Sequence, residues 1–206
     1  GNRYRVIPDA TNIIVHSWDT AQKEQEVNDP TAGTIWHLGS RAPGYYLREV
    51  FRERIGYPAL RRKVIAFAER DRPAAILIED KSSGQSLIQD LRSSTTLPII
   101  AIEPEGNKLF RAMEVSPAVE AGKVFLPESA PWLVDFEGEF FGFPLTKHDD
   151  QVDSVTQFLR WVASWSSTLV FAGAGAPRTT AGMMGMTEGP GSGWGSVSRG
   201  TDVSGY

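Results

Sequence analysis

The chain contains no cysteine, which excludes disulfide bridges, zinc–thiolate sites and a cysteine nucleophile. It has no apolar run near the roughly 20 residues that a membrane helix requires, and no apolar signal segment follows Gly1. Neither sign of charge is in large excess, because 21 basic and 25 acidic residues give a net charge of -4. A global positive field that would attract nucleic acid is therefore absent. These features predict a soluble protein of a reducing compartment, and the start without Met indicates a piece of a longer protein.

Several catalytic motifs are also missing. The sequence has no G-x-S-x-G elbow, no H-E-x-x-H metal motif and no G-x-x-x-x-G-K-[ST] phosphate loop. The missing phosphate loop excludes a nucleotide-hydrolysing motor of the P-loop type. Of the three histidines, we expect His16 and His37 to be packed or surface residues of strands, while His148 precedes a group of acids.

Glycine divides the chain into two parts. The 206 residues are 41% apolar, enough to form the core of one domain. Ten of the 20 glycines lie in residues 167–206, where apolar periodicity disappears. Such a segment buries too little surface to offset the entropy of ordering it. We therefore expect a folded domain over residues 1–166 and a Gly-rich flexible tail over residues 167–206, with a docking peptide as the alternative for the tail.

Strand and helix patterns alternate in the folded part. Three β-type runs with short links cover residues 12–18, 31–38 and 45–51, which is typical of an antiparallel meander. Continuous apolar runs at 74–78 and 98–102 are typical of parallel strands covered on both faces. A further short strand is predicted over residues 124–126. Helices are predicted over residues 58–70, 85–92, 107–121, 132–141 and 149–165. The pattern predicts an α/β fold, a mixed sheet with an antiparallel meander plus parallel strands, flanked by helices.

Carboxylates follow the ends of two predicted strands. Asp19 comes directly after the first strand, and Glu79 directly after a buried apolar run. Sites in open α/β sheets gather beyond strand ends, although a single acid there is more often a turn residue or a helix cap. The start of the last helix carries Asp149, Asp150 and Asp153. One acid would complement the helix dipole, but three repel each other unless a cation or a proton relieves them.

These acids predict a hard, all-oxygen metal site. Oxygen ligands without cysteine and with few histidines favour Mg²⁺ or Mn²⁺ over zinc. Two such ions roughly 3.5–4 Å apart activate a water and stabilise the leaving oxygen in phosphodiester hydrolysis. Spacing along the chain does not itself show that the acids meet in space.

Three motifs together resemble a known family. They are S-W-D-T-A at 17–21, I-E-D-K-S-S-G at 78–84 and H-D-D-Q-V-D-S at 148–154, with Lys108 and Arg111 between the second and the third. In this order they resemble the nuclease domain of tailed-bacteriophage terminase large subunits, over residues 12–165. The resemblance implies an RNase H-like fold and a two-metal-ion endonuclease that uses Mg²⁺ or Mn²⁺ to cut double-stranded viral DNA during genome packaging.

The resemblance also assigns roles to the acids. Asp19, Glu79 and Asp150 match the catalytic, metal-binding acids of the family, and Asp153 is an auxiliary metal ligand. Whether Asp149 or Asp150 faces the metal stays open. In the full-length protein, the implied partners are an ATPase motor domain absent from this chain, a small terminase subunit and the capsid portal. No membrane partner is implied, and the expected location is the cytoplasm of the infected bacterial host, without secretion.

Contacts with DNA would have to come from a local basic surface. Residues 41–72 contain nine basic and four acidic residues, a local charge of +5, while the rest of the chain carries -9. Phosphate contacts from such a segment give affinity without sequence readout, and the alternative is an ordinary solvated surface. The residues that we expect to contact DNA phosphates are Arg48, Arg52, Arg54, Arg61, Arg62 and Lys63.

Two other functions are compatible with the sequence. Another RNase H-like nuclease, such as a resolvase or transposase core, would share the acidic motifs but would cut a symmetric DNA junction in pairs. A non-catalytic docking module between the packaging motor and the capsid portal belongs to a different class, and it would have no reason to bind metal at the acids.

Overall fold

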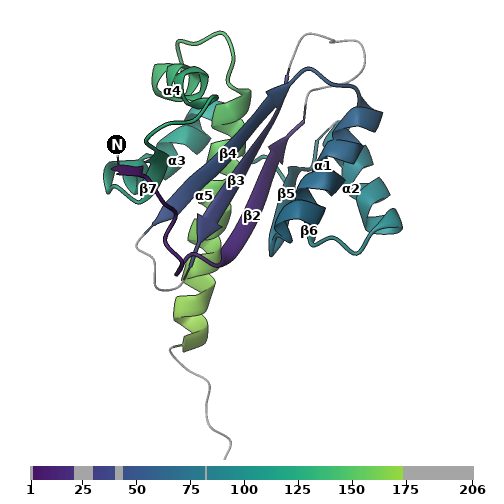
Figure 1. The fold of residues 1–206 in the computed structure, drawn as a ribbon, viewed down its shortest axis with the longest axis horizontal. Coiled ribbons are helices and arrows are strands. Elements are labelled where there is room, and N and C mark those ends of the chain that lie inside the picture. Colours follow the sequence, from purple (N-terminus) through teal and green to yellow (C-terminus); the bar gives the residue numbers. More distant parts are fainter. Residues whose placement is uncertain (1, 21–29, 40–43, 82, 174–206) are drawn as a thin grey trace, which may run out of the picture.

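The structure, a computed structural model, describes residues 2–20, 30–39, 44–81 and 83–173, with side chains described as far as residue 164. A twisted sheet runs through the middle of the molecule and helices lie on both of its faces (Figure 1). In the described part, no helix has the length and apolar character needed to cross a membrane.

The sheet has seven strands in the order β1-β7-β4-β3-β2-β5-β6. The antiparallel meander is confirmed: β2 pairs with β3, and β3 with β4. On one side of it β5 and β6 extend the sheet in parallel, and on the other side β7 and β1 do the same. The strands are β1 (Asn2–Tyr4), β2 (Ile13–Asp19), β3 (Thr31–Leu38), β4 (Tyr45–Glu53), β5 (Ala75–Glu79), β6 (Ile99–Ile102) and β7 (Val124–Pro127).

The helices form two outer layers. They are α1 (Tyr57–Asp71), α2 (Ser83–Ser94), α3 (Lys108–Glu120), α4 (Leu133–Gly142) and α5 (Asp150–Gly173). One core packs α1 and α2 against Trp18, Ile76 and Ile78. The other core packs α3, α4 and α5 against alternate strand residues such as Val15 and Leu77. This is the mixed α/β sheet between helices that the sequence pattern predicts, and it has the RNase H-like fold that the family resemblance implies.

The structure differs from the sequence-based expectation at an additional strand, β1, and at the end of helix α5. Strand β1 was not predicted, because its three residues are mostly exposed and carry no apolar pattern. It joins the sheet edge through parallel pairing with β7, and the Tyr4 hydroxyl donates to the Leu47 carbonyl at 2.7 Å. Helix α5 continues beyond residue 166 to Gly173. The remainder of the predicted tail, residues 174–206, lies outside the described residues.

Helix α5 is buried on its polar side as well as on its apolar side. Its apolar stripe, including Val155 and Leu159, packs in one core, yet every residue from 151 to 159 is buried. The polar side makes a seam with β2: each of the Ser17 and Ser154 hydroxyls donates to the other residue's carbonyl at 2.8 Å. The Gln157 amide donates to the Ser17 hydroxyl at 2.9 Å. These bonds fix α5 along and around its axis relative to β2.

Candidate active site

Parallel pairing of β2 with β5 brings the first two acids together. Trp18 lies opposite Ile78 in the register, so Asp19 and Glu79 leave adjacent strands at the same edge of the sheet. Helix α2 begins close behind them, and it can do so because residue 84 is glycine. A Cβ on Gly84 would lie 1.9 Å from the Glu79 carbonyl oxygen.

The strand ends and the start of α5 enclose a cleft of about 550 Å³. All five of the acids singled out in the sequence line this cleft: Asp19, Glu79, Asp149, Asp150 and Asp153. It is also lined by His148 and by four cationic side chains: Lys81, Lys108, Arg111 and Lys147. The structure thus brings the predicted acids into one place.

The Asp19 carboxyl experiences the strongest repulsion in the cleft. Burial raises its pKa well above the ordinary value of 3.8. Three neighbouring carboxylates raise it further: Asp153, Glu79 and Asp150. A side-chain hydrogen bond with Glu79 raises the pKa of Asp19 in the same direction.

Asp150 lies between the cleft and a second buried acid. Burial and the nearby charge of Glu139 raise the pKa of Asp150 to about 6, although Arg52 opposes the shift. The Arg52 guanidinium lies 3.9 Å from Asp150 Oδ2. This Oδ2 is buried and has no hydrogen-bond partner among the described residues. It is an acceptor atom available for a ligand.

Glu139 is a positioning residue that the sequence analysis missed. It is 6% exposed, and its two oxygens accept hydrogen bonds from the backbone and side-chain nitrogens of Gln151, each at 2.7 Å. It therefore caps the first turn of α5 from the neighbouring helix α4. The available signal was its spacing, since Glu139 follows Leu133 and Phe136 on the buried stripe of α4.

Cations from α3 hold Asp149, which directly precedes α5, and Asp153 in the first turn of α5. Lys108 Nζ lies 2.7 Å from Asp149 Oδ1 and 2.7 Å from Asp153 Oδ2. Arg111 Nη2 lies 2.7 Å from the second oxygen of Asp153. Burial alone would lower the pKa of Lys108, but its hydrogen bonds to these carboxylates raise it above its ordinary value, so Lys108 stays charged.

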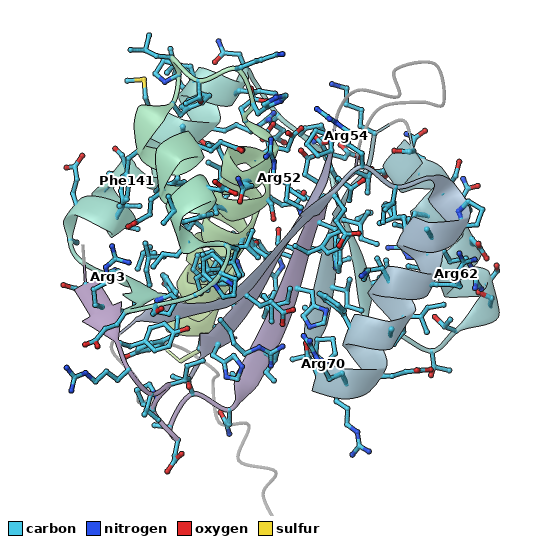
Figure 2. All side chains as sticks on the ribbon, turned by 45° about the horizontal axis from the view of Figure 1, so that its top comes forward. Arg3, Arg52, Arg54, Arg62, Arg70 and Phe141 are labelled. Atoms are coloured by element: carbon cyan, nitrogen blue, oxygen red, sulfur yellow. The ribbon has the colours of Figure 1, made fainter. Side chains whose placement is uncertain are left out.

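None of the six residues predicted to contact DNA lines this cleft. Arg52 contacts one of the lining acids, since its guanidinium lies 3.9 Å from Asp150 Oδ2, and it lies beside α5 in Figure 2. Arg48 pairs with Asp71 and Arg61 with Asp90. Lys63 Nζ lies 3.9 Å from Oε1 of Glu53, the last residue of β4. Figure 2 shows Arg62 on the outer side of α1 and Arg54 near the end of β4.

The donor set fits a hard divalent cation, although it is not preassembled. Oxygen is the only donor type that the five acids offer, and Asp150 Oδ2 has no hydrogen-bond partner in the part of the chain that the structure describes. Within the described residues, no three acidic or histidine side chains lie close enough together to hold one ion as they stand. Asp149 and Asp153 are engaged by α3 instead. A cation that enters the cleft would relieve the repulsion around Asp19.

Comparisons with known proteins bear on the family and the fold of this chain. A family model described as the terminase RNaseH-like domain matches residues 16–160. The large terminase of a thermophilic bacteriophage, solved in complex with ADP, is 15% identical with a TM-score of 0.58; the match covers 77% of this chain and 41% of that one. The large terminase nuclease of the thermophilic phage G20c with bound magnesium is 15% identical with a TM-score of 0.57, over 77% of this chain and 84% of that one.

A third solved structure matches over most of its length. The nuclease domain of the P22 large terminase is 15% identical with a TM-score of 0.52, over 76% of this chain and 84% of that one. No curated protein matches at a significant level. At these identities the solved structures establish the fold. The chain spans less than half of the ADP-bound large terminase and most of the isolated nuclease domains.

Proposed function

This chain belongs to the terminase RNaseH-like domain family, and on that premise we propose that it is a divalent-metal-dependent endonuclease that cleaves double-stranded viral DNA during genome packaging. The observation that carries the proposal is the convergence of acids from β2, β5 and α5 on one cleft. Carboxylates gathered at the ends of adjacent parallel strands are the oxygen-rich environment that phosphodiester hydrolysis with metal ions requires.

Asp19, Glu79 and Asp150 would hold the metal, as two ions of Mg²⁺ or Mn²⁺. When bound, such ions activate the attacking water and stabilise the leaving oxygen. Asp150 is favoured over Asp149 as a ligand, because Asp150 Oδ2 accepts no hydrogen bond from the described residues, whereas Asp149 is hydrogen-bonded and ion-paired to Lys108. Asp153 is an auxiliary ligand, since both of its oxygens face cations in the present arrangement.

The chain's own residues prepare this set of ligands. Burial and the neighbouring acids raise the pKa of Asp19, so a proton held by this carboxyl would leave when a cation enters. Glu139 and Gln151 hold the first turn of α5, which fixes the direction of Asp150. Arg52 lies beside Asp150 and opposes the rise in its pKa, which keeps more of this carboxylate ionised near neutral pH.

The broader setting follows from the same family. Double-stranded DNA is the proposed substrate, and in the full-length protein the proposed partners are an ATPase motor domain, a small terminase subunit and the capsid portal. The proposed location is the cytoplasm of an infected bacterium. The match to the ADP-bound large terminase supports the longer protein, because this chain corresponds to 41% of that one.

A plasmid-cleavage assay with Mg²⁺, Mn²⁺ or EDTA tests the proposal. We expect nicked and linear products with either ion and none with EDTA. Asp19→Asn, Glu79→Gln and Asp150→Asn should each lose most cleavage, because each keeps the side-chain volume and removes a ligand charge; Asp153→Asn should be milder. Glu128→Gln is the matched control, since Glu128 pairs with Arg5 on the surface and does not line the cleft. Metal-independent cleavage, or full activity of Asp19→Asn, would falsify the assignment.

A further inference from the structure

The cleft has a cationic wall that faces its acidic one. Five acids and four lysine or arginine side chains line the same space, so the opposing charges nearly balance without any added ion. The balance is direct at α3, where both oxygens of Asp153 are taken, one by Lys108 and one by Arg111. Lys108 also bonds Asp149.

The sequence of α3 places these two cations together. Asn107 caps the helix by accepting a hydrogen bond from the Phe110 amide at 2.8 Å. Lys108 and Arg111 follow three residues apart, so they share one face of the helix, and that face is turned toward α5. Phe110 and Met113 lie on the exposed side. The two cations therefore project into the cleft from a rigid helical turn.

These ion pairs compete with the proposed metal site. Asp153 is among the carboxylates that raise the pKa of Asp19, so it lies within the acidic cluster, yet its oxygens have no room for a metal while α3 holds them. Arg111 and Asp153 are only 12% and 10% exposed. Charges that are this buried need a replacement partner when a pair is broken.

We propose that Lys108 and Arg111 form the phosphate-binding wall of the cleft and exchange partners there: they pair with Asp149 and Asp153 in the DNA-free protein and with DNA phosphates in the complex. The proposal rests on the nuclease function proposed above. A DNA strand supplies negative charge and a divalent cation supplies positive charge, so the exchange leaves no charge unpaired. The guanidinium of Arg111 suits a phosphate as well as it suits a carboxylate.

The exchange makes metal and DNA binding cooperative. DNA phosphates draw the two cations away and release Asp153 for the metal, while the metal takes over the acids and releases the cations for DNA. Because such coupling is reciprocal, each ligand should tighten the binding of the other by about fivefold or more. A fixed cationic wall that never left the acids would give no such coupling.

Calorimetric titration of the full chain with Mn²⁺ in the absence of DNA tests the competition. Lys108→Met removes a charge that is paired with the acids, and Arg111→Met provides a second, independent variant. Lys147→Met is the matched control, because Lys147 lines the same cleft but forms no ion pair with an acid that the structure describes. We expect both α3 variants to bind Mn²⁺ about fivefold more tightly than the wild type, and clearly more tightly than the control. Affinities equal to that of the control would overturn the exchange.

Fluorescence anisotropy with a duplex that has non-hydrolysable phosphonate linkages tests the DNA side. Mn²⁺ should tighten duplex binding by the wild type, and Lys108→Met should weaken that binding and reduce the slope of log affinity against log salt by about 0.9. Unchanged duplex affinity in both α3 variants would overturn the proposal. If the wild type neither binds Mn²⁺ nor cleaves plasmid, the nuclease function itself is refuted. If the wild type does both but the two α3 variants bind Mn²⁺ no more tightly than Lys147→Met, only the exchange is refuted.

Discussion

Replacing Gly84 with alanine should damage the cleft far more than the fold. A Cβ at this position would lie 1.9 Å from the Glu79 carbonyl oxygen and 3.2 Å from the Glu79 carbonyl carbon. Ordinary contact begins at 3.4 Å, so the start of α2 and the end of β5 would have to separate by about 1.5 Å. Overpacking of this kind costs about 1–3 kcal/mol, which for a domain of this size lowers the Tm by about 2–12 °C.

The consequence for cleavage should be larger, because Glu79 is a proposed metal ligand. A displacement of about 1 Å at a reacting centre can reduce the rate about 100-fold. Plasmid cleavage with Mn²⁺, together with thermal unfolding followed by circular dichroism, measures both effects. Gly138→Ala is the matched control: apart from its chain neighbours and the backbone of its own helix, no atom of the described residues lies within 4 Å of the added Cβ. In the interior of α4 this change should stabilise the protein by about 0.5–1 kcal/mol and leave cleavage unchanged. Wild-type cleavage and Tm in Gly84→Ala would refute this reasoning.

Three further predictions concern stability. Burial lowers the pKa of His16 to about 4, whereas in the unfolded chain this imidazole becomes protonated near pH 6.5. Lowering the pH from 7 to 4 should therefore remove about 3 kcal/mol from the free energy of unfolding. Urea unfolding at stepped pH checks this, and an equally steep loss of stability in His16→Gln would contradict it. Phe158→Ala should cost about 3–5 kcal/mol, because its ring is fully buried and stacks on Trp36 at 4.3 Å, and a loss below 1 kcal/mol in urea unfolding would exclude that role. Asn107→Ala should cost about 1 kcal/mol and speed hydrogen exchange at the Phe110 amide, which loses its acceptor; unaltered exchange would argue against the cap.

The strands and helices that the sequence predicts correctly are those with a strong apolar pattern. Ala75–Glu79 reads as a buried strand because its side chains are apolar on both faces, and both faces are indeed covered. Strand β1 could not be predicted in this way, since it pairs with β7, whose residues lie far from it along the chain. The burial of the polar side of α5 could not be predicted either, because the sequence does not distinguish a buried serine such as Ser154 from an exposed one.

The candidate site also contains contacts that the sequence predicts and contacts that it does not. Asp19 and Glu79 were predictable, since each follows a recognisable strand and parallel neighbours end at one edge of the sheet. The pairing of Lys108 with Asp149 was not, because 41 residues separate them and only the packing of α3 on α5 joins them. For the basic segment 41–72, the expected contacts with DNA stay a prediction. Its excess charge is real, but Arg48 and other members are engaged with acids of their own surface.

The seam between β2 and α5 has a consequence for any redesign of this cleft. Turning or sliding α5 by one residue would separate the buried Ser17 from Ser154 and Gln157, and each polar group left without a hydrogen bond would cost about 1–3 kcal/mol. Asp150 and Asp153 precede Ser154 on the same helix, so side chains that never reach the cleft set where these acids stand. Substitutions that alter ion or substrate preference can therefore be made among the side chains that line the cleft. Transfer of the acids to another scaffold requires the two buried serines and the glutamine to be transferred as well.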